Sequence, residues 1–275
     1  MSEYEIIERI DAFCDVIPRQ RANAEHHGPL VLFVPAGPGW PFYARPRRDR
    51  APWQDSPVSV AGVRRVRARQ RELLIPESFE WIEQVAPDME AAATGSGLVV
   101  HTHPLLTLDT LAPPPPPPPH IAIRLLEPGD PELIHAWAVP GVAFGHPGTA
   151  IGKAGVLERD KIAADHDGGT IALLRERLQS GESALVAAIG PNGPLAAASY
   201  QFADGVAEIT GVGVLPASRR RGLAAGITAL LAADALAQGA DVVFLSATDE
   251  AVARIYERLG FRQVATAMIA DPPDA

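Results

Sequence analysis

The sequence predicts an α/β protein of α+β type, in which a mixed central sheet flanked by helices is preceded by a smaller α/β half. Apolar segments joined by Gly-rich turns fill residues 183–214, and they are typical of an antiparallel meander. A long apolar helix and the almost wholly apolar segment 241–245 follow, and such a segment is typical of a strand buried between neighbours. An unbroken proline run, Pro113–Pro119, separates this region from the first half.

The proline run predicts a boundary between two domains. Each proline ring fixes φ and removes a backbone donor, so the run should form a polyproline II rod of about 20 Å. With 275 residues, the chain can hold one or two domains with cores of their own. We expect an N-terminal domain over residues 1–112, a linker over 113–119 and a C-terminal domain over 120–275. The alternative role of the run is a docking site for a proline-recognition domain.

The acidic composition excludes several classes of partner. The formal net charge is −9 and neither side of the proline run is net positive, so binding to nucleic acid is not expected.

No segment approaches the ~20 apolar residues of a bilayer span, and the first residues are acidic, so we expect a cytoplasmic protein without a membrane partner. Cys14 is the only cysteine, which excludes an intrachain disulfide and a cysteine-rich zinc site.

The first half predicts helices and strands in an order that repeats the end of the second half. We expect a helix over 4–16, a strand over 30–34, a Gly- and Pro-rich loop over 35–41, an arginine-rich helix over 60–74, a strand over 78–82, a helix over 87–94 and a strand pair over 98–108. Two histidine pairs, His26 with His27 and His101 with His103, lack a third ligand in sequence, so no metal site is expected.

The second half predicts an antiparallel meander that gives way to alternating helices and strands. The expected elements are strands over 120–125, 183–189, 195–202, 206–214, 241–245 and 263–269, and helices beginning near 131 and covering 170–178, 223–237 and 249–259. The stretch 138–166 is rich in Gly and Pro and should shape a binding pocket. Its acids Asp160 and Asp165, with Asp167 just beyond, could attract a cation or simply solvate a loop.

The segment Arg219–Gly226 predicts an anion site, because a strand leads into a Gly-containing turn and a helix N-terminus. The first helical amides point outward with partial positive charge, and Gly222 and Ala224 are small enough for phosphates to approach. A nucleotide P-loop is excluded, since no matching Gly-Lys sequence exists. A dinucleotide fingerprint is excluded too, because Gly211 and Gly213 lack the third glycine and the strand-turn-helix setting.

Two motifs resemble the GNAT superfamily of N-acetyltransferases. The family's Arg/Gln-x-x-Gly-x-Gly/Ala signature, directly after a strand, is matched by Arg219-x-x-Gly222-x-Ala224. Its helix with a tyrosine shortly before Leu-Gly-Phe is matched by Tyr256 and Leu259-Gly260-Phe261. The resemblance covers roughly residues 120–270 and implies a GNAT fold. The first half, which lacks the glycine turn, is expected to be a degenerate GNAT-like unit that does not bind acetyl-CoA.

The resemblance implies an acetyl-CoA site, with acetyl-CoA as cosubstrate. By resemblance, backbone groups on one strand would pair with the pantetheine arm, at Val212, Gly213 and Val214. The pyrophosphate would lie on the signature turn, at Arg219, Arg220, Arg221, Gly222, Leu223, Ala224 and Ala225. Asp249 stands where many relatives have an asparagine that contacts the cofactor. An ionised carboxylate can only accept hydrogen bonds, so Asp249 is either a cofactor contact or an N-cap of its helix.

Two residues are the candidates for acid-base chemistry. By resemblance, Tyr256 is the general acid that protonates the departing thiolate, and it would also contact the cofactor; a core tyrosine is the alternative. Glu208 lies between apolar residues on a strand, and period two places it on one face with Thr210, Val212 and Val214. It is a candidate general base, with a surface or salt-bridge role as the alternative. The amide of Val212 would meet the oxyanion.

The sequence therefore predicts an N-acetyltransferase that moves an acetyl group from acetyl-CoA to a primary amine by direct attack in a ternary complex. The acceptor is expected to be a small-molecule or peptide amine, which the negative charge would attract. The alternatives are a non-catalytic CoA-binding or interaction module and an acyltransferase that uses longer acyl-CoA. The oligomeric state is not readable from the sequence.

Overall fold

The computed structural model describes residues 1–37, 42–48, 57–166 and 168–273. Its contacts divide the chain into two compact units. Unit 1 contains Met1–Leu105, Ser246–Asp249 and Gln263–Ala275. Unit 2 contains Leu106–Leu245 and Glu250–Arg262. The predicted Gly- and Pro-rich loop over 35–41 and Asp167 lie partly or wholly outside the described residues.

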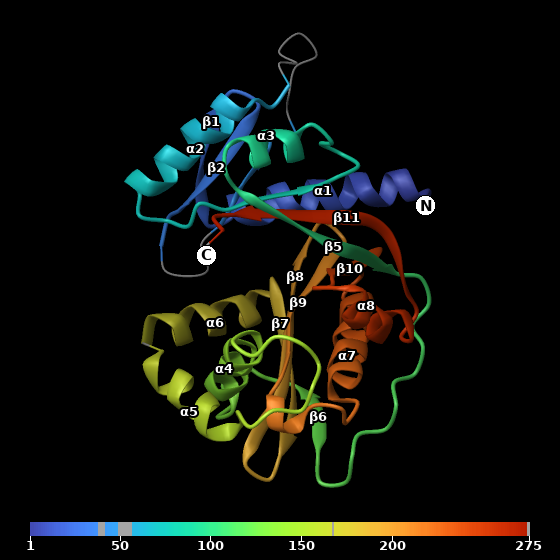
Figure 1. Cartoon of the computed structure of the whole chain (residues 1–275). Helices are drawn as coiled ribbons and strands as arrows, with labels where there is room; N and C mark the ends of the chain where they lie inside the picture. The colour runs from blue at the N-terminus through green and yellow to red at the C-terminus, as the bar shows by residue number, and fades with distance from the viewer. Residues whose placement is uncertain (38–41, 49–56, 167, 274–275) are drawn as a thin grey trace. The chain divides into compact units, whose positions relative to one another are not determined.

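Among the described residues, unit 1 contains six neighbouring strands and three helices (Figure 1). The strand order is β1-β2-β3-β4-β11-β5. The strands are β1 Ala22–His27, β2 Leu30–Pro35, β3 Ala44–Pro46, β4 Phe79–Ile82, β5 Val99–Leu108 and β11 Phe261–Asp271. The helices are α1 Glu3–Arg19, α2 Val60–Glu72 and α3 Met89–Gly95. The strand β3 runs parallel to β4, and the chain's last strand, β11, pairs antiparallel with β4.

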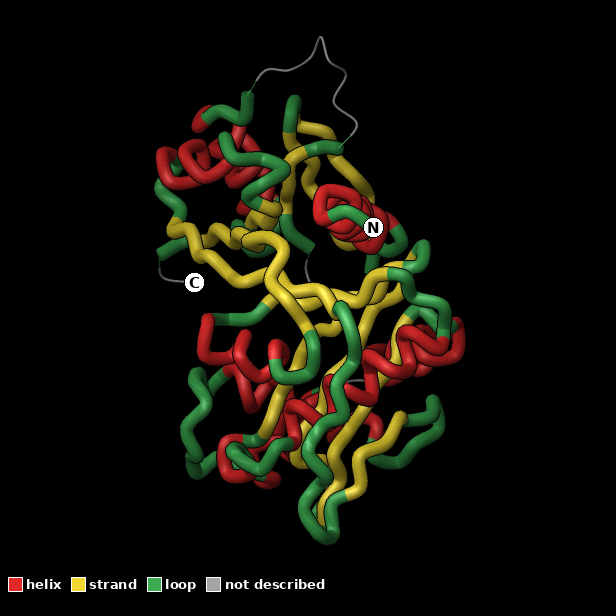
Figure 2. Tube along the Cα trace, turned by 90° about the vertical axis from the view of Figure 1, so that its right-hand side faces the viewer, coloured by secondary structure: helices red, strands yellow, loops and turns green. Residues whose placement is uncertain are grey.

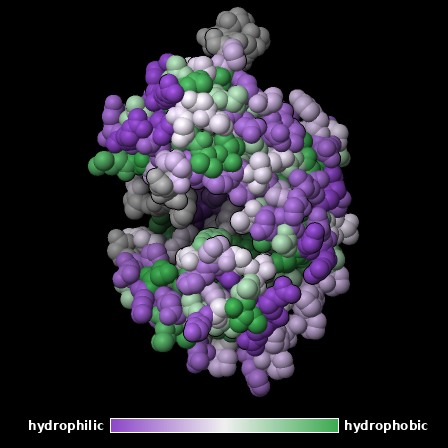
Figure 3. Space-filling view, viewed as in Figure 1, coloured by the Kyte–Doolittle hydropathy of each residue, from purple (hydrophilic) through white to green (hydrophobic). Residues whose placement is uncertain are grey.

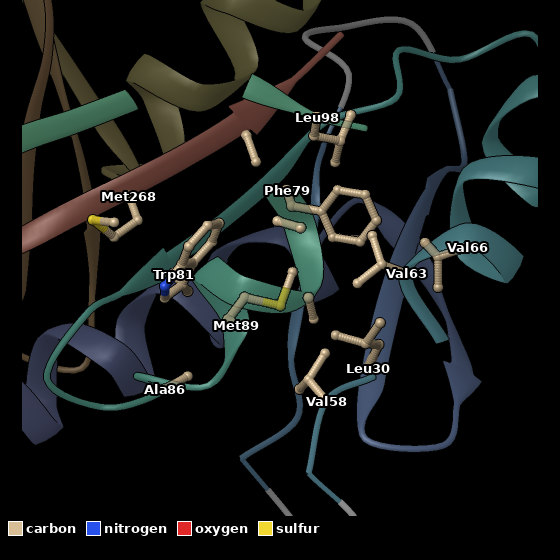
Figure 4. Close-up of a cluster of buried hydrophobic side chains, with 14 of the residues drawn as sticks. Leu30, Val58, Val63, Val66, Phe79, Trp81, Ala86, Met89, Leu98 and Met268 are labelled. Carbon is tan, nitrogen blue, oxygen red and sulfur yellow. The ribbon is translucent and has the colours of Figure 1, made fainter. Parts of the chain in front are cut away.

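The core of unit 1 is built from apolar faces of its helices and strands. Figure 4 shows Phe79 and Trp81 of β4 surrounded by side chains from α2, α3 and β2. Met268 from β11 belongs to the same cluster and is 1% exposed. Residues at the end of the chain therefore complete the core of the first unit, and their burial stabilises it.

Unit 2 contains the meander and the helices that follow it. Its strand order is β10-β9-β8-β7-β6, with the ends of β5 and β11 contributing. The strands are β6 Ala122–Leu125, β7 Ser183–Gly190, β8 Gly193–Ala203, β9 Val206–Val214 and β10 Val242–Ser246. The helices are α4 Leu133–Phe144, α5 Val156–Asp165, α6 Gly168–Ser180, α7 Leu223–Ala237 and α8 Glu250–Glu257. Figure 1 shows α4, α5 and α6 on one face of β7, β8 and β9 and α7 on the other.

Most predicted elements are confirmed, with differences where the pattern is weak. The expected strand pair over 98–108 is wrong, because a single long strand, β5, covers this stretch without a turn. The sequence patterns do not predict three of the elements: β1 has the polar sequence Ala-Asn-Ala-Glu-His-His, β3 has three residues, and α5 lies in the Gly- and Pro-rich stretch. Each is too polar or too short to show a periodicity of its own.

The compact units differ from the predicted ranges at both ends of the C-terminal half. The boundary falls at Leu105 and Leu106, before the proline run, so the run belongs to unit 2. Residues 263–275, expected in the second domain, belong to unit 1 through the pairing of β11 with β4. The position at which the protein can be divided therefore stays a prediction, which a truncation at His120 tests.

Two glycines end helices in corresponding places of the two halves. Gly97 follows α3 with φ +94°, and Gly260 follows α8 with φ +95°. This positive φ favours glycine, because a Cβ in the left-handed region is strained. A Cβ on Gly260 would in addition collide with the carbonyl oxygen of Thr110. The repeat that the sequence indicates thus extends to the backbone conformation after each helix.

Replacing Gly260 by alanine is expected to lower the free energy of unfolding by about 3 kcal/mol or more, since strain and a backbone collision add. Gly239 gives a matched control, because its φ is +93° and a Cβ there would have no atom within 4 Å. Gly239→Ala should cost only the strain of the left-handed conformation, about 1 kcal/mol. Urea denaturation of both variants measures the difference, and equal losses would contradict the packing of Gly260 on Thr110.

An ion pair secures the start of α4. Asp130, whose side chain is 8% exposed, accepts hydrogen bonds from the Arg124 guanidinium and from the Glu132 N–H, the latter at 2.9 Å. The hydrogen bond from Arg124 lowers the pKa of Asp130, and the Glu132 N–H lowers it further. A carboxyl group whose pKa is lower in the folded state than in the unfolded state stabilises the fold at pH values above its unfolded-state pKa. This contribution is lost as the pH falls through its folded-state pKa.

We therefore expect Asp130→Asn to be less stable than the wild type near neutral pH, with the difference shrinking as the pH falls below about 4, the unfolded-state pKa of an aspartate. Urea unfolding at several pH values measures it. Asp165→Asn, at an exposed position at the end of α5, is the control and should show no such convergence. A difference between Asp130→Asn and wild type that does not change with pH would contradict the role of the ionised carboxylate.

No helix within the described ranges is long and apolar enough to cross a membrane. On the face shown in Figure 3, hydrophobic residues form separate groups among hydrophilic ones. Contiguous apolar patches mark membrane or partner interfaces, and this face shows none of large extent among the residues described.

Candidate acyl-CoA site

The site begins where two parallel strands separate. β9 and β10 pair from Val206 with Val242 to Glu208 with Phe244. In the part of the chain that the structure describes, this pairing ends there, although β9 continues to Val214. The later part of β9 therefore has an edge that β10 does not pair with. Such an edge can hydrogen-bond an extended ligand as an added strand would.

A β-bulge lies in this later part of β9. Ser199 of β8 lies opposite Thr210, whereas Ala197 lies opposite Gly213, so β9 holds one extra residue between them. Gly211 adopts φ +63° at this position. A bulge inserts one residue, bends the strand and shifts the alternation of its side chains.

The bulge corrects the expectation that one face carries Glu208, Thr210, Val212 and Val214. Residues directly opposite in an antiparallel pair share a face, so Glu208 and Thr210 remain on one face. After the extra residue the alternation is reversed, and Val214 lies on the opposite face. Simple period two is therefore wrong beyond Thr210.

Glu208 projects on the face that α4 covers. Gly213 shares this face, and a Cβ there would lie 2.8 Å from Cα of Pro140 in α4. The opposite face is covered by α7, because Tyr200 on that face donates a hydrogen bond of 2.6 Å to Asp234 of α7. The half-buried Glu208 thus lies on the α4 side of the strand that leads to the turn.

The turn after β9 opens the N-terminus of α7. Arg220 adopts φ +64° and Gly222 adopts φ +75°, and Gly222 is the N-cap without a side chain to cap the helix. The first helical bond runs from the Gly226 N–H to the Gly222 oxygen at 3.1 Å. The amides of Leu223, Ala224 and Ala225 therefore have no acceptor inside the helix and can meet an anion.

The corresponding helix in unit 1, α2, has an N-terminus that is capped by a side chain. Ser59 is the N-cap of α2, and its hydroxyl accepts a hydrogen bond of 3.1 Å from the Gly62 N–H. This bond occupies a donor that α7 leaves for a ligand. The difference supports the expectation that the first half is degenerate as a phosphate site.

The guanidinium of Arg219 binds backbone carbonyl oxygens, which differs from the expected contact with a phosphate. Its guanidinium donates to the carbonyl oxygens of Ala143, His146, Ala150 and Val214, at 2.6–3.4 Å. Burial lowers the pKa of Arg219. The signature arginine therefore ties the loop after α4 to the end of β9, and it positions the turn. Arg220 and Arg221 lie beside the turn, and both are exposed.

Tyr256 lies in the last turn of α8, the helix that follows β10. Its side chain is 5% exposed, and its ring meets Phe261 edge to face with centroids 6.2 Å apart. Burial raises the pKa of the Tyr256 hydroxyl above its usual value, because the phenolate would be poorly solvated. The hydroxyl therefore stays protonated over the whole physiological range and can act as a proton donor.

The remaining predicted residues have clear positions. Val212 lies within the bulge of β9, and Gly213 follows it before the turn. Asp249 directly precedes α8 and is exposed. Asp160 receives two hydrogen bonds from Arg159, which also binds the carbonyl oxygens of Asn192 and Pro194. Asp160 therefore takes part in a structural cluster, which weighs against its role as a cation attractor.

Sequence reasoning missed the contact between the proline run and the turn. A Cβ on Gly222 would lie 3.2 Å from Cγ of Pro115. Figure 2 shows the run as part of a long loop between strands β5 and β6. A run of identical residues carries no signal for the side on which it packs, so only the structure reveals this contact.

The histidine pairs form ordinary contacts. His101 lies 3.4 Å from a carboxylate oxygen of Asp271, and the Nδ1 atom of His103 lies 3.2 Å from the Thr248 oxygen. His27 lies 3.5 Å from a carboxylate oxygen of Glu25. Among the described residues, no group of three or more His, Cys, Asp or Glu side chains is placed to hold a metal ion.

A cavity of about 300 Å³ lies in unit 1. It is lined by both acids and arginines, including Asp11 and Arg48, which form an ion pair at 2.7 Å. β3 and β4 pair at Ala44 and Phe79, and the cavity lies beyond this point, beside Pro46 and Trp81. Unit 1 thus repeats the separating parallel strands of unit 2, but charged side chains that pair with one another line the gap.

Two parallel strands that separate, a strand bulge and an open helix N-terminus thus lie together in unit 2. Residues 146–261 match the model of the Acetyltransferase (GNAT) family. This segment of the chain is similar to members of that family. The match supports acyl transfer in general and the use of an acyl-CoA.

Solved structures extend the likeness over both halves. A GCN5-related N-acetyltransferase from Kribbella flavida is 23% identical, with 98% of this chain and 96% of that chain covered and a TM-score of 0.69. A protein assigned to the GNAT family from Novosphingobium aromaticivorans is 19% identical, with 99% of each chain covered and a TM-score of 0.56. A tandem GNAT protein of the clavulanic acid biosynthesis pathway is 15% identical, with 88% of this chain and 77% of that chain covered and a TM-score of 0.53.

The TM-scores show a shared fold, and the tandem protein matches the two-half architecture. No curated protein matches the chain. The predicted GNAT fold, with a mixed sheet flanked by helices, is confirmed.

Proposed function

We propose that the chain is an N-acetyltransferase that uses acetyl-CoA and acetylates a primary amine by direct attack in a ternary complex. The observation that carries the proposal is the arrangement on β9: an edge not paired with β10, a bulge, and a turn that ends at the open N-terminus of α7. Backbone groups of Val212, Gly213 and Val214 would hold the extended arm of the substrate. The turn amides would hold its pyrophosphate.

The residues fit this substrate. The first-turn amides of α7 have no acceptor within the helix, and Arg220 and Gly222 just before them have the positive φ found in backbone turns that bind anions. Arg220 and Arg221 add positive charge beside them. Asp249, before α8, would complete the site either by accepting a hydrogen bond from the substrate or by supporting the start of its helix.

The chemistry requires loss of a proton from the amine and gain of one by the leaving sulfur. Acetyl-CoA supplies the acetyl group in activated form, as a thioester. Glu208 accepts the proton that the attacking amine loses, directly or through a water molecule. The amide of Val212 donates to the carbonyl oxygen as negative charge develops there. Tyr256 donates its proton to the sulfur when the carbon–sulfur bond breaks, and solvent restores the tyrosine proton.

The acceptor is proposed to be a small-molecule or peptide amine. The net charge of −9 favours the approach of a cation and disfavours nucleic acid or an anionic membrane surface as a partner. Arg219 holds the loop after α4 through the carbonyl oxygens of His146 and Ala150, so this loop is the proposed border of the acceptor pocket. The proposed location is the cytoplasm.

An assay of thiol release tests the proposal against its alternatives. Acetyl-CoA and longer acyl-CoA donors are each combined with a panel of amines, and free thiol is followed optically. Release that requires both acetyl-CoA and an amine supports the proposal. Faster release with longer donors would favour a longer-chain acyltransferase, and tight binding without turnover on any amine would favour a non-catalytic CoA-binding module.

A further inference from the structure

The segment 109–123, which contains the proline run, contacts the two ends of the candidate site. Its first part follows Ala112, whose N–H donates to the carbonyl oxygen of Leu259 at 2.9 Å. The N–H of Asp109 donates to the Gly260 oxygen at 3.0 Å in the same way. These bonds join the residues just before the run to the turn that follows α8, the helix that carries Tyr256.

The middle of the run lies against the phosphate turn. Pro115 approaches Gly222, the N-cap of α7, at a distance that leaves little space even for a methyl group. Most prolines of the run are otherwise exposed, so this is a local contact and not a buried core. The run therefore supports the turn from the outside.

The end of the run is fixed to α7 as well. It leads into β6, where Ile123 packs so closely on Gly226 that a Cβ there would collide with its side chain. Gly226 lies one helical turn after Gly222. The run is thus anchored at α8, touches the N-cap of α7, and is anchored again one turn further along α7.

A polyproline segment is stiff, because each φ is fixed before the protein folds. A stiff connection between three anchored points holds the points at a constant separation. With a flexible connection of the same length, the turn would lose more conformational entropy when the ligand binds.

We propose that Pro113–Pro119 is a positioning element of the acyl-CoA site, which preorganises the phosphate turn at Gly222 for the phosphate-bearing part of the substrate. This inference rests on the proposed function. It concerns affinity for the phosphates and not the acetyl transfer itself, because the contact lies at the turn and not at Tyr256 or Glu208.

The test replaces the seven prolines by seven residues of Gly and Ser in the full chain. The KM for acetyl-CoA should rise about tenfold or more, while kcat stays within about threefold of the wild type. S-acetylpantetheine, which carries the thioester arm without the nucleotide, should react with both proteins equally. Pro115→Ala is the smaller variant, expected to show the same pattern to a lesser degree.

The outcomes separate this inference from the proposed function. Absence of acetyl-CoA binding to the wild type would refute the proposed function and this inference with it. Wild-type binding with an unchanged KM in the Gly/Ser variant would overturn only the positioning role. Equal losses of activity with acetyl-CoA and with S-acetylpantetheine would also overturn the positioning role, since they would mean a general loosening of the fold. Far-UV circular dichroism and thermal unfolding check that the variants fold. If the Gly/Ser variant does not fold, the KM of Pro115→Ala for acetyl-CoA decides the test.

Discussion

Tyr256→Phe is expected to lower turnover with acetyl-CoA by about 100-fold or more and to leave acetyl-CoA binding intact, the usual scale for loss of a general acid. The variant removes only the hydroxyl from a buried ring, and the contact with Phe261 remains. Because burial raises the pKa of Tyr256, wild-type kcat should not fall on the alkaline side through loss of this proton until well above neutral pH. Thiol release and isothermal titration measure the two quantities.

Tyr200→Phe is the matched control for this experiment. Tyr200 is also buried, and its hydroxyl donates to Asp234 on the face covered by α7. Burial, together with the hydrogen bond to Asp234, raises its pKa as well. This variant should lose stability and keep its turnover. Unchanged kcat in Tyr256→Phe, or equal losses in both variants, would contradict the assignment of Tyr256 as general acid.

A chain that begins at His120 is expected to be insoluble or unfolded, and to bind no acetyl-CoA. The truncation removes β4, the partner of β11, and so exposes Met268 and Ala270, which are at most 1% exposed in the whole chain. It also removes the bonds from Asp109 and Ala112 to the end of α8. Size-exclusion chromatography, circular dichroism and titration with acetyl-CoA measure the result.

The control for the truncation is a full chain cut within the exposed proline run by an inserted protease site. The two fragments should stay together after cleavage, because β4 lies in the first and β11 in the second. Fragments that separate and keep acetyl-CoA binding in 120–275 would instead support two independent domains over the predicted ranges 1–112 and 120–275.

The sequence predicts the C-terminal fold well because its signals are local. The apolar strand at 241–245, the turn at Arg219–Gly222 and the glycine after α8 each reflect the conformation of a few neighbouring residues. The pairing of β11 with β4 is not local, because it joins strands that are far apart in the sequence. Both strands are apolar and either could pair with several neighbours, so no residue pattern selects between them.

The candidate site shows the same limit. The turn amides follow from the position of Gly222, and the motif locates Tyr256. The bulge at Gly211 does not follow from alternation, since a glycine in a strand is compatible with a regular ladder too. The engagement of Arg219 with backbone carbonyls also escapes the motif, because a motif gives the residue type and not the direction of its side chain.

The central claim is that the open N-terminus of α7 binds the phosphates of acetyl-CoA, and titration of Gly222 variants tests it most directly. Gly222→Asp places a carboxylate at the N-cap, whereas Gly222→Asn places a neutral side chain of the same shape there, and both residue types tolerate the positive φ. We expect the wild type to bind acetyl-CoA, and Gly222→Asp to bind about tenfold or more weakly than Gly222→Asn, because like charges repel at this helix end. Equal affinities of the two variants, or no binding by the folded wild type, would contradict the account.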